Sequence, residues 1–287
     1  MKLLLVLLLT VATTAHAQDD YSAVIYQGED PKLAMKTSDI DSIKFMTTTA
    51  VDPTLYTVTN KSRWKDKRII FLGNSITEYA EYVNAYAELT GCTALNYGVG
   101  GTHMAKIDAN TTNAFETRAA SLPTRADMVV VFGGTNDFGH TNTAEFGEFS
   151  DGTKADRYTF YAGLHRLFST LVKRFRLKPI VIMTPVHHGT EIDVPEYIIN
   201  SDGTITEGKN PKTGKTFREY VDAIKEVAAY YSIIVLDAYS YSRLSPMTEL
   251  GTSRYFFRDG LHLSERGGQR LAKWMYPQLE MVYDMFY

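Results

Sequence analysis

The sequence of 287 residues has a single cysteine, Cys92, so no disulfide can form within the chain and its stability must come from packing. It also lacks an excess of either charge, since 30 lysines and arginines stand against 33 aspartates and glutamates and give a net charge of -3. This balance excludes the strongly basic surface that binds nucleic acid. Cys92 follows Gly91 with no histidine motif beside it, so we interpret it as a small buried residue rather than a catalytic thiol.

Long apolar runs are absent beyond the first residues, so we expect no stable membrane insertion. Residues 1–17 combine a positive start, an apolar run over 3–11 and a small-x-small cleavage site ending at Ala17, which predicts a signal peptide. A membrane anchor needs about 20 apolar residues, and Thr13 and Thr14 interrupt this run too early. No cysteine stands at the cleavage point, as lipid anchoring would require. We therefore expect a secreted or periplasmic protein.

Residues 18–60 differ from the rest of the chain and contain short β-prone stretches at 23–26, 33–36 and 42–46. They predict a small β-rich appendage that is too short to be stable alone, followed by a threonine-rich linker. The remaining residues, 61–287, suffice for one large domain, which we predict to carry the function.

In that large domain, compact apolar strands alternate with amphipathic segments, a pattern typical of βα units and a parallel sheet. The predicted strands span residues 68–72, 94–97, 128–132, 180–184 and 233–236. Apolar residues at helical spacing predict helices over 158–175, 220–231 and 269–286. The fold class is therefore α/β, a three-layer sandwich around a mostly parallel five-stranded sheet. Ligands of such folds bind beyond the carboxyl ends of the strands.

Gly73-Asn74-Ser75 follows the first of these strands and precedes a segment rich in helix formers. The hydroxyl of Ser75 would be displayed at the edge of the sheet, where the free amides of a helix start favour a developing negative charge. Serine is also a preferred helix cap, and for this motif alone the cap is the better interpretation. The other strand ends decide between the two.

Two further motifs follow the second and third strands. Gly98, Gly100 and Gly101 allow the backbone to approach a substrate closely, although they lack the spacing of a dinucleotide-binding loop. Asn136 follows Gly133-Gly134-Thr135, and its carboxamide can donate a hydrogen bond toward the same crevice. Donors from several strand ends that converge in this way form an oxyanion hole.

Near the carboxyl end, Asp259 and His262 stand three residues apart, a spacing that brings two side chains together on a helical turn. The Asp259 carboxylate could then hold one nitrogen of the His262 ring and leave the other free. An isolated pair of this kind is more often structural. Together with a serine it completes a Ser-His-Asp triad.

These motifs, in this order, resemble those of the SGNH hydrolase (GDSL-like esterase/lipase) family, over residues 68–278. The resemblance implies a flavodoxin-like fold with Ser75 as nucleophile and Asp259 and His262 as acid and base. It also implies an oxyanion hole made by Ser75, the amide of Gly101 and the side chain of Asn136. The sequence departs from the family at one position, since Gly-Asp-Ser reads Gly73-Asn74-Ser75 here.

Four more histidines follow the strands, and we interpret them as structural or surface residues: His103, His140, His187 and His188. The side chains of adjacent histidines point apart on most backbones, so we predict no metal and no cofactor. The polar insertions 141–156 and 191–216 predict loops over the cleft that set specificity.

The sequence as a whole predicts a secreted serine esterase. Its polar loops favour short acyl groups, such as acetyl esters on a polysaccharide or oligosaccharide. A lysophospholipase or lipase acting on longer chains, and an acyltransferase using the same triad, are the enzymatic alternatives. The alternative outside enzymes is a carbohydrate-binding surface protein that keeps the fold without catalysis.

Overall fold

The computed structural model describes residues 22–27, 30–36, 62–189, 193–247 and 255–287, and the chain divides into two units, Met1–Thr59 and Asn60–Tyr287. In the first unit, β1 (Ser22–Gln27) pairs antiparallel with β2 (Asp30–Lys36). The predicted signal peptide, the β-prone stretch 42–46 and the predicted linker lie outside the described residues.

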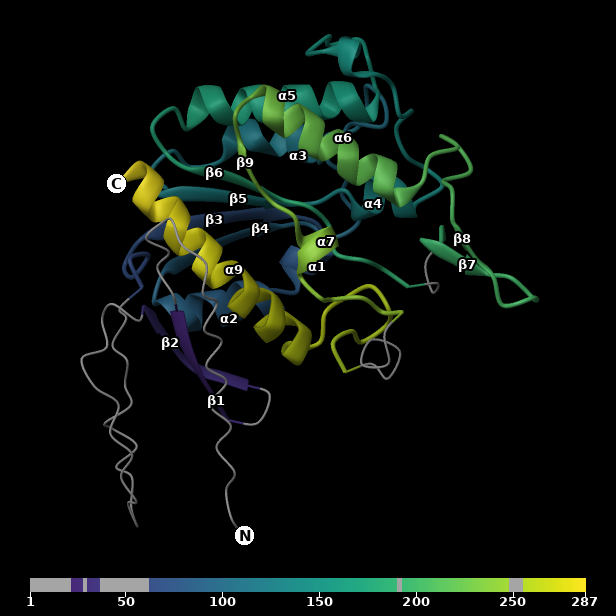
Figure 1. Ribbon diagram of the computed structural model, residues 1–287. Helices are drawn as coiled ribbons and strands as arrows, with labels where there is room; N and C mark the ends of the chain where they lie inside the picture. The colour runs from purple at the N-terminus through teal and green to yellow at the C-terminus, as the bar shows by residue number, and fades with distance from the viewer. Residues whose placement is uncertain (1–21, 28–29, 37–61, 190–192, 248–254) are drawn as a thin grey trace, which may run out of the picture. The chain divides into compact units, whose positions relative to one another are not determined.

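The second unit is built around a five-stranded parallel sheet with the order β4-β3-β5-β6-β9 (Figure 1). Its strands are β3 (Arg68–Gly73), β4 (Thr93–Gly98), β5 (Met128–Phe132), β6 (Ile180–Met183) and β9 (Ile234–Leu236). The predicted α/β class and all five predicted strands are confirmed. The chain passes from β3 to β4 on one side and then crosses to β5 on the other, so the order switches direction between β3 and β5. Ligands of doubly wound folds bind at such a switch point.

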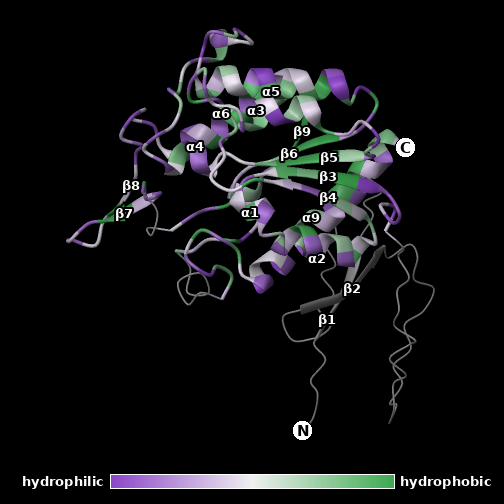
Figure 2. Ribbon diagram, turned by 180° about the vertical axis from the view of Figure 1, so that it is seen from behind, coloured by the Kyte–Doolittle hydropathy of each residue, from purple (hydrophilic) through white to green (hydrophobic). Residues whose placement is uncertain are grey.

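Helices cover both faces of the sheet, because alternate side chains of each strand point to opposite faces. Ile70, Val129 and Ile182 contribute to one hydrophobic core and Phe71, Val130 and Val181 to the other. Figure 2 shows the resulting hydrophobic colour along the strands. One core is covered by α3 (Phe115–Arg118), α5 (Phe160–Arg174) and α6 (Phe217–Tyr230), and the other by α2 (Glu81–Thr90) and α9 (Glu265–Phe286). Cys92 is buried in the second core, and burial raises the pKa of its thiol.

Two predicted helices begin earlier than their apolar periodicity indicated. The side chain of Thr216 caps α6 and forms a reciprocal capping box with Glu219, while Ser264 caps α9. Because a capping side chain satisfies the amides that the first turn leaves free, each helix can begin before its apolar stretch does. Among the described helices, none is long and apolar enough to cross a membrane.

The insertion predicted as a loop over 191–216 contains a small antiparallel hairpin of β7 (Tyr197–Ile199) and β8 (Ile205–Glu207). Gly203 supplies the left-handed turn with φ of 82°, and the amide of Asn200 donates to the Thr204 carbonyl. The insertion over 141–156 is mostly irregular, with one short 3-10 turn at Phe149–Asp151. The loop prediction was therefore wrong for the hairpin.

Candidate active site

Ser75 is the first residue of α1 (Ser75–Glu78), directly after β3. The residue that caps this helix is Asn74, whose side-chain oxygen accepts a hydrogen bond of 3.0 Å from the amide of Ile76. The departure from Gly-Asp-Ser therefore keeps a capping oxygen at this position. Because Asn74 serves as the cap, the hydroxyl of Ser75 is free for another partner, and the cap interpretation of Ser75 is wrong.

That partner is His262, whose Nε2 lies 2.9 Å from Oγ of Ser75. The other ring nitrogen, Nδ1, lies 2.6 Å from Oδ2 of Asp259. A carboxylate at Nδ1 fixes the proton there, so Nε2 is the acceptor that faces the serine hydroxyl. The structure thus brings the three predicted residues into one hydrogen-bonded chain in which His262 can take up the Ser75 proton.

The loop that carries Asp259 and His262 is a tight bend rather than the predicted helical turn. Oδ1 of Asp259 accepts hydrogen bonds from the amides of His262, at 2.7 Å, and Leu261, at 3.0 Å. Gly260 has φ of 82°, a conformation that favours glycine and closes the bend. Partial burial raises the pKa of Asp259, but the bonds from His262 and the two amides outweigh it, and the pKa lies below its ordinary value. The carboxyl is therefore held as a carboxylate.

The glycine-rich loop after β4 lies beside Ser75. A side chain added at Gly100 would place its Cβ 3.8 Å from the Cβ of Ser75 and 2.7 Å from the Glu78 carboxylate. Gly101 has open space around it but adopts φ of 69°, so its backbone conformation, rather than crowding, favours glycine. Glycine at position 100 therefore lets the backbone of this loop pass close to Ser75.

Asn136 lies at the start of α4 (Thr135–Gly139), directly after β5. Its Nδ2 donates a hydrogen bond of 2.9 Å to the carbonyl of Thr102, the residue after Gly101. This bond fixes the carboxamide next to the glycine loop and leaves a second N–H on the same nitrogen. Ser75 and Asn136 follow β3 and β5, so they flank the switch point of the sheet.

Two residues that the sequence did not single out hold these loops together. Asp137 is buried, and its carboxylate accepts hydrogen bonds from the amides of Met104 and Ala105 at 2.9 and 3.2 Å. Burial raises the pKa of Asp137 to about 7, although these two hydrogen bonds act to lower it.

Arg118 donates to the carbonyls of Gly73 and Tyr97, at 2.9 and 2.7 Å, where β3 and β4 end. Burial lowers its pKa to about 10.

The four other histidines predicted to follow strands do not join the Ser75 chain. His103 is buried with its ring 5.6 Å from that of His140, whose Nδ1 lies 3.5 Å from Asp193. His187 and His188 point to different partners, a carboxylate and a backbone carbonyl. Within the described residues, no three histidine, cysteine, aspartate or glutamate side chains are grouped to hold a metal ion.

A cavity of about 310 Å³ lies elsewhere, between α7 (Ala238–Tyr241) and α9. Its lining contains none of the predicted site residues and consists of Tyr241, Ser242, Arg243, Arg270, Lys273 and Trp274.

Replacing Asn136 with alanine is expected to lower kcat by roughly 10² to 10³, the effect of losing one side-chain donor to an oxyanion. Steady-state hydrolysis of p-nitrophenyl acetate measures this. Asn200→Ala, in the exposed β7–β8 turn, is the matched control and should retain the parent rate. An unchanged kcat in Asn136→Ala would assign Asn136 to loop structure alone.

The GDSL-like Lipase/Acylhydrolase family model matches residues 71–270. One solved structure is 29% identical, with a TM-score of 0.61, over 77% of this chain and 99% of its own. A protein from Lactobacillus plantarum is 23% identical, with a TM-score of 0.61, over 78% of this chain and 99% of its own. A possible lipase from Chitinophaga pinensis is 18% identical, with a TM-score of 0.56, over 75% and 98%. No curated protein matches the chain.

Proposed function

Since the chain belongs to the GDSL-like lipase and acylhydrolase family and is thus a carboxylic ester hydrolase, we propose that it removes acetyl and other short acyl groups from carbohydrates through Ser75, His262 and Asp259. The observation that carries the proposal is the chain of hydrogen bonds from Ser75 Oγ to His262 Nε2, 2.9 Å, and from Nδ1 to Asp259, 2.6 Å.

The reaction proceeds in two steps. His262 takes the proton of Ser75 as Oγ attacks the ester carbonyl, and Asp259 stabilises the imidazolium that forms. Amides of Ser75 and Gly101 and the side chain of Asn136 stabilise the negative oxygen. His262 then gives its proton to the departing alcohol. In the second step a water, deprotonated by the same ring, attacks the acyl-enzyme, releases the carboxylic acid and restores Ser75.

Polar side chains beside this site favour a polar alcohol as the leaving group. His140 follows α4 and His187 follows β6, and both side chains are partly exposed. Small acyl groups need less apolar surface for binding than long chains do. Together these features support esters of short acids with hydroxyl-rich alcohols.

Labelling with a fluorophosphonate and a series of substrates tests the proposal. The parent should react with the probe, cleave p-nitrophenyl acetate faster than the palmitate ester, and release acetate from acetylated xylo-oligosaccharides. Preference for the palmitate ester would favour a lipase or lysophospholipase. Transfer of the acyl group to an added alcohol in preference to water would favour an acyltransferase. Absence of labelling would favour a non-catalytic carbohydrate-binding protein.

Hydrolysis is expected to slow as the pH falls from about 7 to about 5, because a histidine base accepts a proton only as neutral imidazole. Buried His103 and His188 do not titrate in this range, since burial lowers the pKa of each to about 4. A pH profile of kcat/KM for p-nitrophenyl acetate measures the effect. A flat profile down to about pH 4 would contradict a histidine base.

The proposal includes export, with removal of residues 1–17. Expression in the native host should yield a protein in the periplasm or medium whose mass corresponds to a start at Gln18. Mass spectrometry of the cell fractions measures this. Accumulation of the chain with residues 1–17 retained in the cytosol would contradict export.

A further inference from the structure

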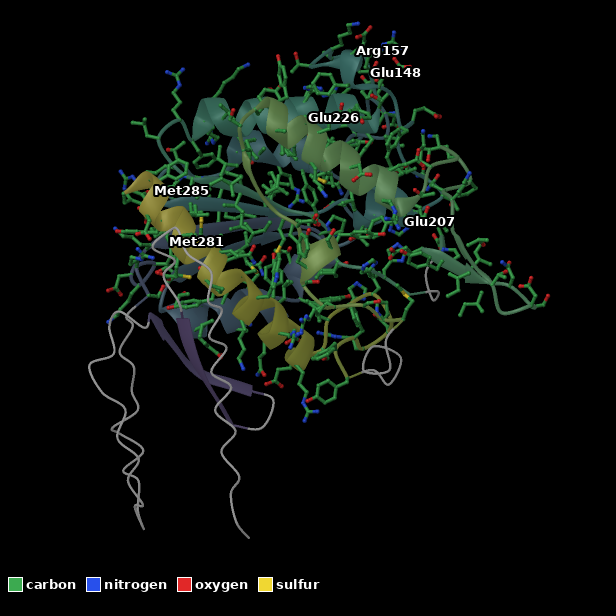
Figure 3. All side chains as sticks on the ribbon, in the orientation of Figure 1. Glu148, Arg157, Glu207, Glu226, Met281 and Met285 are labelled. Atoms are coloured by element: carbon green, nitrogen blue, oxygen red, sulfur yellow. The ribbon has the colours of Figure 1, made fainter. Side chains whose placement is uncertain are left out.

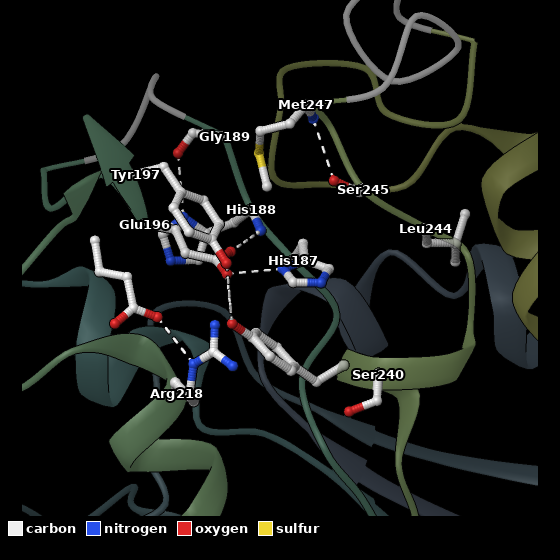
Figure 4. Close-up of polar contacts among 12 residues, drawn as sticks. His187, His188, Gly189, Glu196, Tyr197, Arg218, Ser240, Leu244, Ser245 and Met247 are labelled. Atoms are coloured by element: carbon white, nitrogen blue, oxygen red, sulfur yellow. Dashed lines mark hydrogen bonds and ion pairs between the residues drawn. The ribbon is translucent and has the colours of Figure 1, made fainter. Parts of the chain in front are cut away.

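A second carboxylate–imidazole pair, His187 and Glu196, lies beyond the end of β6 (Figure 4). Nδ1 of His187 lies 2.7 Å from Oε1 of Glu196. The same carboxylate accepts hydrogen bonds from the hydroxyl of Tyr239, at 2.9 Å, and from the amide of His188, at 3.1 Å. Glu196 is only 2% exposed, so its charge is buried and satisfied by three donors.

These contacts fix the orientation of the His187 ring. A carboxylate at Nδ1 keeps the proton on that nitrogen, so Nε2 of the neutral ring is an acceptor. The ring of Tyr239 packs against that of His187, with centroids 4.1 Å apart, and limits its rotation further. His187 is thus held in one tautomer and one direction.

The second ring nitrogen of His187, Nε2, is accessible, unlike that of a histidine with a purely structural role. Nε2 of His103 and of His188 are buried, whereas the side chain of His187 is 21% exposed and its Nε2 is not enclosed. Nε2 of His187 has no hydrogen-bond partner within the part of the chain that the structure describes. In the Asp259–His262 pair the corresponding nitrogen meets Ser75. In the Glu196–His187 pair it is available to a ligand.

The pair lies close enough to the triad to contact the same substrate. Gly73 pairs with Phe132 and Phe132 with Met183, so β3, β5 and β6 end at one level. Adjacent strands are about 4.8 Å apart, which puts the ends of β3 and β6 roughly 10 Å from each other. The amide of Gly189 also donates a hydrogen bond of 2.7 Å to the carbonyl of Gly260, inside the bend of Asp259 and His262.

We propose that His187, oriented by Glu196 and Tyr239, forms a binding site for a hydroxyl group on the alcohol part of the ester. The inference rests on the proposed function and deepens it, since a sugar presents several hydroxyls near an acetylated position. A second hydroxyl of the alcohol donates a hydrogen bond to Nε2 of His187 while the acyl group lies at Ser75. This hydroxyl site selects esters of polyols over esters of alcohols without a second hydroxyl.

The test compares kcat/KM for an acetylated xylo-oligosaccharide with that for p-nitrophenyl acetate, whose alcohol has no second hydroxyl. His187→Ala should lower the ratio of the two values about five- to tenfold, mainly by raising KM for the saccharide, which is the effect of one neutral hydrogen bond. Tyr239→Phe, which keeps the ring and removes one donor to Glu196, should lower the ratio by a smaller factor. Methylation of the free saccharide hydroxyls should lower kcat/KM for the parent but have little further effect in His187→Ala.

The matched control is Tyr161→Phe, which removes a tyrosine–carboxylate hydrogen bond of 2.6 Å to Glu226 between α5 and α6. Glu226 is labelled on the helical layer in Figure 3. The control should leave the ratio unchanged. Equal losses on both substrates in His187→Ala, together with a lower melting temperature, would assign the pair a structural role and overturn the inference.

Failure of the inference differs from failure of the proposed function. If the parent deacetylates the saccharide and His187→Ala leaves the ratio unchanged, the hydroxyl site is overturned and the function stands. If the parent cleaves p-nitrophenyl acetate but no acetylated saccharide, the proposed substrate class is overturned and the hydroxyl site with it.

Discussion

Alanine at Ser75 is expected to lower kcat for p-nitrophenyl acetate by at least about 10⁴-fold, because the nucleophile of a triad acts as a unit with its base. In the structure Oγ of Ser75 is bonded to Nε2 of His262 and is not needed as the cap of α1, which Asn74 provides. Removing Oγ should therefore abolish acyl-enzyme formation without unfolding the helix start. Steady-state kinetics and fluorophosphonate labelling measure the two effects together.

The control for this substitution is Ser169→Ala on α5, where the hydroxyl donates to the carbonyl of Arg166. Its rate and labelling should match those of the parent. Thermal unfolding of Ser75→Ala should also stay close to that of the parent. If Ser75→Ala hydrolysed the ester at near the parent rate, or still reacted with the probe, another residue would have to be the nucleophile.

The central strands β3, β5 and β6 of the parallel sheet could be predicted from sequence because they are buried on both sides and read as short apolar runs. Met128–Phe132 is such a run, and its predicted and observed bounds agree. The β7–β8 hairpin escaped prediction because each strand has three residues and is largely exposed, with Ile199 71% and Ile205 67% accessible. The Asp202-Gly203 turn between isoleucines was the local signal that could have revealed it.

The candidate site was predictable to the extent that its residues follow strand ends in order. Ser75, Gly101 and Asn136 are fixed by the strands that precede them. The residues that hold these loops in place were not predictable, since each contact depends on which loops meet in space. Asp137 bonds to amides 32 and 33 residues earlier in the chain. No sequence period encodes a pairing at that distance, and the same holds for the tyrosine–carboxylate bond from Tyr239 to Glu196, 43 residues apart.

Changing Asp259 to asparagine is expected to lower kcat by about 10⁴-fold while leaving the fold intact. The Asn carbonyl oxygen can still accept from the amides of Leu261 and His262, so the bend is kept. Its NH₂ group would then face Nδ1 of His262 and donate to it. The ring must in consequence carry its proton on Nε2, where it cannot accept the proton of Ser75.

The kinetics of Asp259→Asn and its thermal unfolding check this expectation together. The control is Asp202→Asn, since Oδ1 of Asp202 accepts the amide of Thr204 in an exposed turn, as Oδ1 of Asp259 accepts that of Leu261, but faces no imidazole. The control should keep its kcat. A kcat of Asp259→Asn within about tenfold of the parent would show that the tautomer of His262 does not depend on this carboxylate. A large loss of kcat at an unchanged melting temperature would instead distinguish two roles of Asp259. Its Oδ2 keeps the proton of His262 on Nδ1, and its Oδ1 maintains the shape of the bend by accepting from backbone amides.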